Sequence, residues 1–410
     1  MSIRAAVLNA VLVIIVALVA LQTAVVVSSA IATRFRRRRD AIFPNRQPAR
    51  LSEVAEDNAV TLYTYGMDLY DAMLDDIRKA TQSICIESFI WKGDTIGAAF
   101  KEAIIDQAKQ GVEVFVIFDS FANMVVPRAF KLFPNNIHIY RYRAWRRPLD
   151  IIDPRRLARD HRKLLIVDER IGYLGGYNIG DLYGAKWRDT HVRIEGDAAR
   201  QLHASFIDFW TEHAGSTVRP RATQAPALQP HVRLYINNPT RIMFPIRSMY
   251  IEAIDLAKDQ ILLTTPYFVP DRFVLESLIR AAKRGVSVQL LVPEQSNHLL
   301  ADWLARTYFT KCLRRGIRIF LYQGAMIHAK TATIDREWTT VGTANLDRLS
   351  LMGNHEVNVE FFGAQLARQM EDIFIEDRAH GRELLLHEWL KRPLVQKLGE
   401  LVLSPYWPFL

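Results

Sequence analysis

Cysteine is scarce in this 410-residue sequence, which has only Cys85 and Cys312. Cys85 lies in an apolar, strand-like run and Cys312 in a helix-like one, so both are expected to be buried, reduced thiols. Two cysteines exclude a disulfide framework and a cysteine-rich zinc motif. The sequence also lacks a HExxH zinc pattern and a glycine-rich phosphate loop. Neither a metal nor a cofactor is therefore expected.

The net charge is small once the amino-terminal region is set aside. The net charge of +9 includes eight Arg and one Asp in residues 1–50, a net of +7, which leaves only +2 for residues 51–410. This distribution weakens the case for a nucleic-acid partner. It places the excess of Arg where it can bind an anionic membrane surface, and each Arg there contributes about 1 kcal/mol of binding free energy. A simple topology signal is the alternative explanation.

Charge is absent altogether from Ala5 to Thr33, a run rich in Ala, Val, Leu and Ile. A bilayer-spanning helix needs about 20 apolar residues, so a transmembrane helix is predicted over 5–33. A cleaved signal peptide is the rival, because "AIA" at 30–32 looks like a cleavage site. The length of the run and the "RFRRRR" that follows favour a retained anchor. A basic juxtamembrane segment (34–55) would then stay in the cytoplasm with the rest of the chain, at the cell inner membrane.

One motif occurs twice, as "HRKLLIVD" at 161–168 and "HAKTATID" at 328–335. The two copies stay in step downstream, with a Gly at +14, an Asn at +17 and a carboxylate at +28 from each His. The matched residues are Gly175 and Gly342, Asn178 and Asn345, and Asp189 and Glu356. The chain is therefore a repeat.

The repeat extends upstream, where 83–119 and 260–294 each show an apolar run, a helical segment, a Gly and a second apolar run. This order predicts a strand, a helix and a parallel strand. Each half should continue with a helical stretch, further strands and a final helix. We expect two tandem α/β domains, each a mostly parallel sheet with helices on its faces, related by approximate twofold symmetry. The predicted division is 56–218, a Pro-rich linker at 219–231, 232–378, and a carboxyl-terminal tail at 379–410.

The repeated polar residues suit a phosphodiester if the halves pack into one pocket. Along a strand, His161 and Lys163 point the same way, as do His328 and Lys330. The lysines, supported by Asn178 and Asn345, could neutralise phosphate oxygens, while one imidazole attacks phosphorus and the other protonates the leaving oxygen. Asp189 and Glu356 could each orient one imidazole. Asp168 and Asp335 fall at strand ends, where holding a turn is the favoured role.

These residues and spacings resemble the phospholipase D superfamily, whose signature is HxKxxxxDxxxxxxG with an Asn three places after the Gly. The resemblance covers about 56–378 and is greatest to bacterial cardiolipin synthases, through "HRKLLIVDERIGYLGGYNIGDLY", "TTPYFVPD" and "HAKTATIDREWTTVGTANLD". It implies transfer of a phosphatidyl group between two phosphatidylglycerol molecules in the membrane through a phosphohistidine. It also implies a catalytic set whose members are His161, Lys163, Asp168, His328, Lys330 and Asp335.

The resemblance makes His161 the nucleophile and His328 the general acid and then base, although near-symmetry leaves the two exchangeable on sequence grounds. The family commonly shows "NxDxRS" after the second motif, whereas this chain has "NLDRLS" at 345–350, which bears on substrate preference. Two other functions stay open. One is hydrolysis of phospholipid or nucleic acid, and the other is a non-catalytic lipid-binding protein, against which two complete motifs argue. The segment "YRYRAWRRP" (140–148) could grip anionic headgroups or be a plain basic loop.

Overall fold

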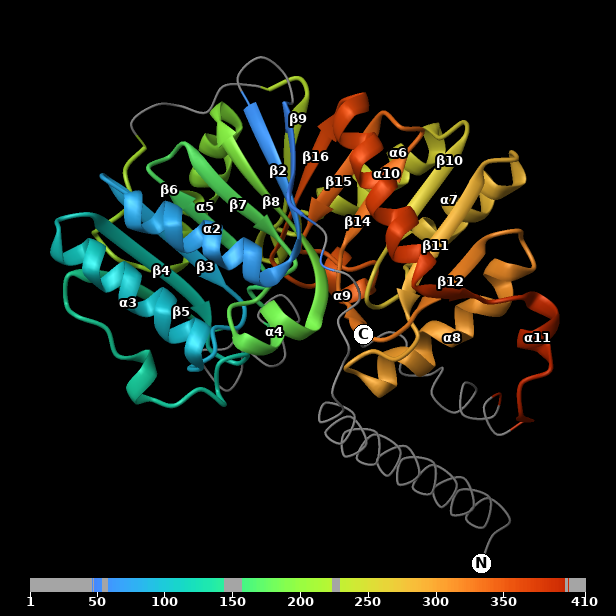
Figure 1. Cartoon of the computed structure of the whole chain (residues 1–410), viewed down its shortest axis with the longest axis horizontal. Coiled ribbons are helices and arrows are strands. Elements are labelled where there is room, and N and C mark those ends of the chain that lie inside the picture. Colours follow the sequence, from blue (N-terminus) through green and yellow to red (C-terminus); the bar gives the residue numbers. More distant parts are fainter. Residues whose placement is uncertain are drawn as a thin grey trace, which may run out of the picture.

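The chain forms two α/β domains that lie side by side (Figure 1). The computed structural model describes residues 46, 48–53, 58–143, 157–222, 229–394 and 397. The predicted membrane helix (5–33), most of the basic segment after it, the middle of the predicted linker and residues 398–410 lie outside this part. Within it, no helix combines the length and the apolar character that crossing a bilayer requires.

Each domain is built on one sheet, and equivalent strands follow the same order in both. The first sheet runs β1 (Arg50–Glu53), β2 (Asn58–Tyr65), β8 (Trp187–Gly196), β7 (Ile171–Gly175), β6 (Leu164–Val167), β3 (Ser83–Ser88), β4 (Glu113–Asp119) and β5 (Ile137–Tyr142). The second runs, in the equivalent order, β9 (Val232–Asn237), β16 (Glu356–Phe362), β15 (Trp338–Gly342), β14 (Thr331–Ile334), β10 (Gln260–Thr264), β11 (Ser287–Pro293), β12 (Arg318–Tyr322) and β17 (Gly381–Glu383). The predicted pair of like α/β domains is confirmed.

The prediction of mostly parallel sheets is wrong, because only β3, β4 and β5, and likewise β10, β11 and β12, run parallel. Every other neighbouring pair on these two paths is antiparallel. One reversal in each sheet, from β6 to β7 and from β14 to β15, is a tight turn after the motif, in which Asp168 and Glu169, and Asp335 and Arg336, have φ between 49° and 59°. Two successive positive φ angles reverse the chain in a hairpin. Such turns usually carry Asn-Gly or Asp-Gly, so Asp-Glu and Asp-Arg hid the reversal.

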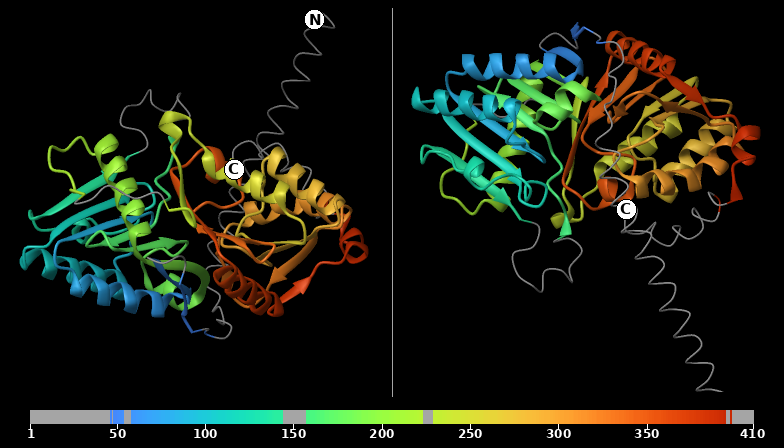
Figure 2. Two further views of the ribbon diagram at one scale, coloured as in Figure 1. Left: turned by 90° about the horizontal axis from the view of Figure 1, so that it is seen from above. Right: turned by 60° about the horizontal axis from the view of Figure 1, so that its bottom comes forward.

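Helices cover both faces of each sheet (Figures 1 and 2). Those of the first domain are α2 (Gly66–Lys79), α3 (Thr95–Lys109), the short α4 (Asp181–Lys186) and α5 (Asp197–His213). Those of the second are α6 (Pro245–Leu256), α7 (Arg272–Lys283), α8 (Leu299–Leu313), the short α9 (Arg348–Met352), α10 (Ala364–Ala379) and α11 (Leu386–Leu390). In the first domain α2 and α3 lie on the face opposite α5, and in the second α10 lies opposite α6 and α7.

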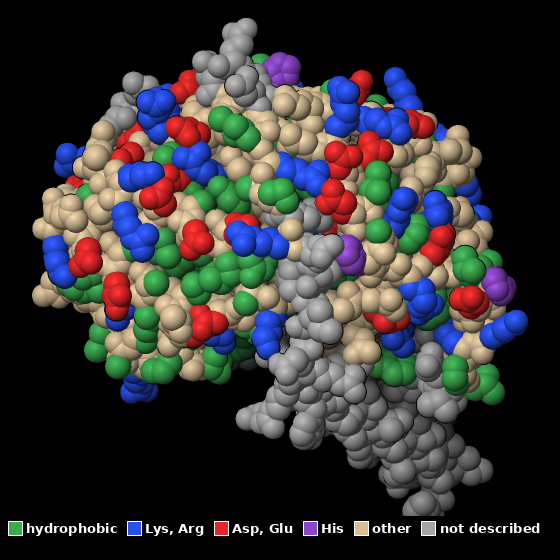
Figure 3. Space-filling model, viewed as in Figure 1, with side chains coloured by type: hydrophobic (Ala, Val, Ile, Leu, Met, Phe, Trp, Pro, Cys, Tyr) green, Lys and Arg blue, Asp and Glu red, His purple; other side chains and the backbone are tan. Residues whose placement is uncertain are grey.

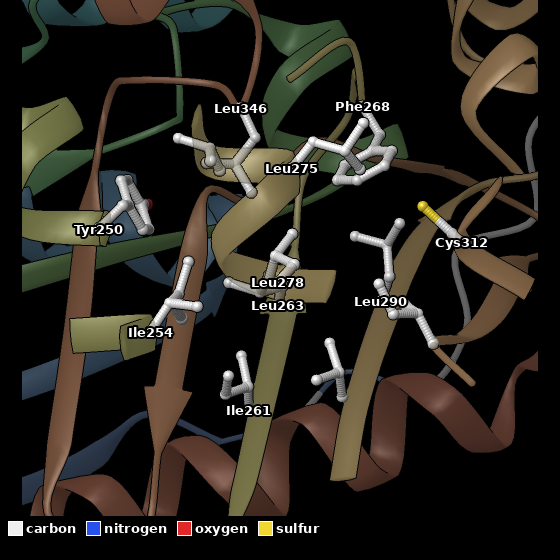
Figure 4. Packing of buried hydrophobic residues seen from close by; sticks show 14 of the residues in the cluster. Tyr250, Ile254, Ile261, Leu263, Phe268, Leu275, Leu278, Leu290, Cys312 and Leu346 are labelled. Atoms are coloured by element: carbon white, nitrogen blue, oxygen red, sulfur yellow. The ribbon is translucent and has the colours of Figure 1, made fainter. Parts of the chain in front are cut away.

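Apolar side chains at helical and strand spacing form the cores. In the second domain, Ile254 of α6, Leu278 of α7 and Leu263 of β10 point toward one another, and Cys312 of α8 belongs to the same cluster on the far side of Leu290 (Figure 4). Both cysteines are free and buried, as predicted. Helix α7 begins where the Asp271 carboxylate accepts hydrogen bonds from the amides of residues 273 and 274, at 2.7 and 3.1 Å.

A further core cluster joins the two domains. Leu202 and Phe206 of α5 belong to the same buried cluster as Val357 of β16 and Met370 of α10. At the carboxyl end of the chain, β17 extends the second sheet and Trp389 of α11 packs against Phe309, with ring centroids 5.7 Å apart. This part of the predicted tail therefore packs on the second domain.

The two domains differ in the connection that follows their second parallel strand. In the second domain this connection contains α8, a helix of 15 residues. In the first it is irregular, with one 3-10 turn, η1 (Ala129–Lys131), so the helix predicted there is wrong. Pro127 and Pro134 interrupt the segment, and a proline inside a helix removes a hydrogen bond and clashes with the preceding turn.

Candidate active site

The residues that lead into each motif histidine pair with the backbone of the other domain. His161 N donates to His355 O at 3.0 Å, next to the start of β16. His328 N donates to Arg188 O at 2.6 Å, and the short strand β13 (Met326–Ile327) pairs with the start of β8. The HxK residues therefore lie just before β6 and β14 rather than on them. This reciprocal pairing brings each histidine to the domain it does not belong to.

Each imidazole contacts the carboxylate of the opposite domain. His161 Nδ1 lies 2.9 and 3.0 Å from the two carboxylate oxygens of Glu356, and His328 Nδ1 lies 2.7 Å from Asp189 Oδ2. Both carboxylates are completely buried. A carboxylate at Nδ1 fixes the orientation and the tautomer of the ring, which leaves Nε2 as the atom that can meet a phosphorus.

The two motif lysines are buried beside the imidazoles. Lys163 Nζ donates to the His161 carbonyl at 2.7 Å, and Lys330 Nζ donates to the His328 carbonyl. Lys330 Nζ also lies 2.8 Å from His328 Nδ1. Burial lowers the pKa of Lys163 to about 7 and that of Lys330 to about 8. An anionic group placed between them would favour their charged forms, as phosphate binding requires.

The two histidine–carboxylate pairs differ in their electrostatics. Burial raises the pKa of Glu356 to about 8 and lowers that of His161, which Lys163 and Lys330 lower further. Burial alone would raise the pKa of Asp189, but Lys330 and His328 outweigh it and hold that pKa below its ordinary value. His161 therefore faces a carboxyl group that retains a proton near neutral pH. His328 faces an ionised carboxylate, which favours a proton on its ring, although burial and Lys330 lower the pKa of His328 to about 3 in the free protein.

Aromatic rings separate the imidazoles from a cleft of about 740 Å³ between the domains. The Phe89 ring lies 4.7 Å from that of His161, and the Trp187 ring 4.8 Å from that of His328. Both aromatic residues line the cleft. Of the two aromatic residues that the sequence suggested, Tyr267 lies 6.3 Å from the His328 ring, whereas Trp91 packs against Phe130 and Phe133. Phe89 and Trp187 were missed, although both sit beside predicted site strands.

The two repeated asparagines lie three residues after the ends of β7 and β15. Asn178 Oδ1 accepts a hydrogen bond from the amide of Ile90 at 3.2 Å, so its carbonyl is occupied by backbone. Asn345 Oδ1 is buried and has no hydrogen-bond partner within the described part of the chain. Across that same part, no group of three His, Cys, Asp or Glu side chains is arranged to hold a metal ion. The role of both asparagines in binding phosphate stays a prediction.

The motif aspartates lie just after β6 and β14, where their carboxylates bind backbone, and their membership of the catalytic set stays a prediction. The Asp168 carboxylate accepts hydrogen bonds from the amides of residues 81, 82 and 83 and from the Thr81 hydroxyl, at 2.8–3.0 Å. Asp335 accepts three from the amides of residues 258–260, each at 2.8 Å. Six residues lie between each histidine and its aspartate, which places the two about 20 Å apart along an extended chain. These carboxylates fix a hairpin to the start of a strand.

A buried charged cluster supports the first motif only. Arg162 Nη2 lies 3.1 Å from Glu87 Oε2 and donates to Ser205 Oγ at 3.1 Å. Asp160 adjoins the cluster, and burial raises the pKa of both Glu87 and Asp160. By strand register, the corresponding positions of the second half are Thr264, Ile327 and Ala329. The charged residue between His161 and Lys163 was the available sequence signal.

The histidine at 191, expected in a supporting polar role, is buried on β8 behind Lys163. It lines a small cavity that Lys163 and Glu87 also line. Neither ring nitrogen has a partner within the described residues, and burial lowers the pKa of His191 to about 3. This ring is therefore neutral and acts as a packing group against the site.

Comparison with known proteins gives a consistent result. A family model described as "Cardiolipin synthase, PLD-like domain" matches residues 73–210 and 250–378. The major cardiolipin synthase of Bacillus subtilis is 33% identical over 85% of this chain and 76% of its own length. A cardiolipin synthase of Staphylococcus aureus is 33% identical over 84% of this chain and 72% of its own. The crystal structure of the phosphatidylserine synthase of Haemophilus influenzae shares the fold, with a TM-score of 0.63, 12% identity and coverage of 88% of this chain and 94% of that one.

Proposed function

Because the chain belongs to the family of cardiolipin synthases with phospholipase D-like domains, we propose that it is a phosphatidyltransferase that makes cardiolipin from two phosphatidylglycerol molecules. The observation that carries this proposal is the reciprocal pairing of His161 with Glu356 and of His328 with Asp189. Each imidazole needs the other domain for its carboxylate, so the two form one catalytic group.

In the first step, Nε2 of His161 attacks the phosphorus of one phosphatidylglycerol. The bond between phosphorus and the glycerol oxygen breaks, and that oxygen takes a proton from His328 as glycerol leaves. Lys163 and Lys330 stabilise the charge on the non-bridging oxygens, and Asn178 and Asn345 support them. The product of this step is a phosphatidyl group bound to His161. The asymmetry of the two carboxyl groups supports this order of roles.

In the second step, His328 takes the proton of the primary hydroxyl of a second phosphatidylglycerol. The resulting oxygen attacks phosphorus, the bond from phosphorus to His161 breaks, and cardiolipin is released with both imidazoles restored. Water in place of the second lipid would give phosphatidic acid, which is the reaction of a hydrolase.

The test is product analysis with the detergent-solubilised full chain and labelled phosphatidylglycerol. We expect cardiolipin and glycerol in equal amounts from the parent protein and neither from His161→Ala or His328→Ala. Phosphatidic acid as the sole lipid product would replace the transferase with a hydrolase. Near-normal turnover in either histidine variant would end the two-imidazole mechanism.

The proposed location is the cell inner membrane, with residues 5–33 as a single anchor and the catalytic domains in the cytoplasm. The apolar run and the Arg cluster after it support this orientation. A cysteine placed in residues 1–4 should react with a membrane-impermeant thiol reagent in intact cells, whereas one at Gln110 should react only after lysis. Labelling of Gln110→Cys in intact cells would show that the catalytic domains lie on the opposite side of the membrane.

A further inference from the structure

We propose that residues 120–136, the irregular connection between β4 and β5, form the surface through which the catalytic domains contact an anionic lipid bilayer. The proposal rests on the proposed function, because it states where a site that acts on membrane lipid meets the membrane. It concerns a part of the structure distinct from the amino-terminal anchor.

Large apolar side chains of this connection are exposed to solvent. Met124 is 65% exposed, Val125 78% and Leu132 66%, and Phe121 is 48% exposed. In the second domain the equivalent connection is α8, and Leu304 and Phe309 of that helix are buried. The first domain therefore presents apolar groups to solvent where the second folds them inward. In Figure 3, hydrophobic side chains gather along the lower left edge, where this connection runs in Figure 1.

Basic side chains stand next to these apolar groups. An open depression of about 480 Å³ is lined by Arg128, Lys131, Arg141 and Arg143, and no carboxylate belongs to its lining. Lys131 Nζ donates to Asn123 O at 2.9 Å, and Arg141 Nη2 donates to Lys131 O at 2.8 Å, so backbone carbonyls position two of the cations. Among the described residues, no ion pair involves any of the four. Their charge is therefore available to anionic headgroups.

The basic depression adjoins the cleft that Phe89 and Trp187 line, the two aromatic residues whose rings pack against the imidazoles. Met124 lines both, and Phe121 and Val125 line the cleft as well. The parallel strands β3, β4 and β5 all end at this edge, so the connection and the cleft open in the same direction. A bilayer resting on Met124 and Val125 would thus face the cleft, and a lipid could move from one to the other with little exposure to water.

The combination of side chains selects a lipid surface. Aliphatic groups and Met flanked by Arg and Lys match the boundary between acyl chains and anionic headgroups, where the former enter the apolar region and the latter meet phosphate. Phosphatidylglycerol, the proposed substrate, supplies that negative charge.

The experiment places a fluorophore at Val125→Cys in the full chain, reconstituted into vesicles that contain phosphatidylglycerol and lipids with brominated acyl chains. Cys85 and Cys312 are completely buried, so an exposed cysteine can be labelled selectively. The matched control is Gln110→Cys, an exposed position before β4 at the opposite end of the sheet. Brominated chains should quench the label at 125 and leave the label at 110 bright.

A second arm replaces Arg128 and Arg143 with Gln, two cations that line the depression but not the cleft. Removing two charges near an anionic surface should raise the vesicle phosphatidylglycerol needed for half-maximal rate by about 25-fold, at roughly fivefold per charge. Turnover of monomeric short-chain phosphatidylglycerol should stay within about twofold of the parent.

The outcomes separate this inference from the proposed function. Equal quenching at 125 and 110, or none at 125, in vesicles where cardiolipin is still made overturns the lipid-contact surface alone. A change in the fluorescence of the label at 125 with protein concentration, in detergent without phospholipid, would assign the surface to contact with a second copy of the chain and would also overturn the proposal. Quenching at 125 without cardiolipin production would support the lipid-contact surface and overturn the proposed transferase activity.

Discussion

The exchange of carboxylates between domains predicts that Glu356→Gln and Asp189→Asn impair different chemical steps. Glu356 contacts His161 and Asp189 contacts His328, although each carboxylate belongs to the opposite repeat. Each substitution keeps the size of the side chain and removes its capacity to be an anion. If the carboxylates served the histidines of their own repeats, the two effects would be interchanged.

The expected magnitudes differ because the two carboxyl groups differ in charge. Asp189 is ionised beside His328, so Asp189→Asn removes the charge that stabilises the imidazolium and should lower kcat by about 10³–10⁴-fold, as loss of a triad carboxylate does elsewhere. The pKa of Glu356 is raised to about 8, so this group already carries a proton near neutral pH. Glu356→Gln should therefore cost about 10–100-fold, the equivalent of one hydrogen bond to a partly charged group.

The assay compares natural phosphatidylglycerol with a phosphatidyl ester of p-nitrophenol, whose leaving group departs without a proton. The first-turnover burst of p-nitrophenol from Asp189→Asn should approach the parent rate, because the step that His328 protonates is bypassed, whereas later turnovers still need His328 as the base for the acceptor. Glu356→Gln should stay impaired on both substrates, since attack by His161 is still required. Asp168→Asn, the same substitution about 20 Å away along the chain, is the control and should behave as the parent on both.

Rescue of Glu356→Gln together with continued failure of Asp189→Asn on the activated ester would refute the assigned roles. Equal losses of 10³-fold or more for both variants on natural substrate would contradict the asymmetry of the two carboxyl groups. Either result can be distinguished from unfolding by the circular dichroism spectrum of the variant.

Three further predictions concern pH, the turn aspartates and the domain interface. Lys163 and Lys330 lose their protons as pH rises through about 7 and 8, so kcat/KM should fall over that range. Lys163→Arg should move this fall in kcat/KM to higher pH. A parent kcat/KM that falls only above pH 9 would contradict the prediction. Asp168→Ala should lower the free energy of unfolding by about 2–4 kcal/mol, because it leaves backbone donors unpaired and puts Ala at φ 49°. The kcat of the folded protein should stay unchanged, and a selective loss of kcat would instead support Asp168 as a member of the catalytic set. The buried ion pair of Arg188 and Asp377 joins the domains through two hydrogen bonds of 2.6 and 2.9 Å. In thermal unfolding, Arg188→Met should destabilise the protein by about 3–5 kcal/mol, because Asp377 is left as an unpaired buried charge, and the double variant Arg188→Met, Asp377→Leu should be destabilised much less. Equal losses of stability would show that the unpaired charge is not the cause.

Duplication is what made this protein interpretable from its sequence. Two copies of a His-Lys motif with Gly, Asn and a carboxylate in step predicted two like domains and named the imidazoles, the lysines and the carboxylates that the structure brings together. The strand, helix and strand of each half could be predicted as well, because side-chain periodicity reports local backbone geometry. The comparisons add the family, which the motif spacing had already indicated.

Other features depended on contacts that no local pattern encodes. Asp-Glu and Asp-Arg in positive-φ turns concealed the hairpin that follows each motif. Two prolines interrupt the segment at 120–136, where a helix was expected and an exposed connection is found. The sequence could not decide whether His161 contacts Glu356 or Asp189, which lie 195 and 28 positions after it. The structure decides, because the backbone of residues 159–161 pairs with the residue before β16 and so brings His161 to Glu356. The identity of the reacting groups was therefore set by the sequence. Their partners and protonation were decided by tertiary burial, because only packing determines which charges share a site without water.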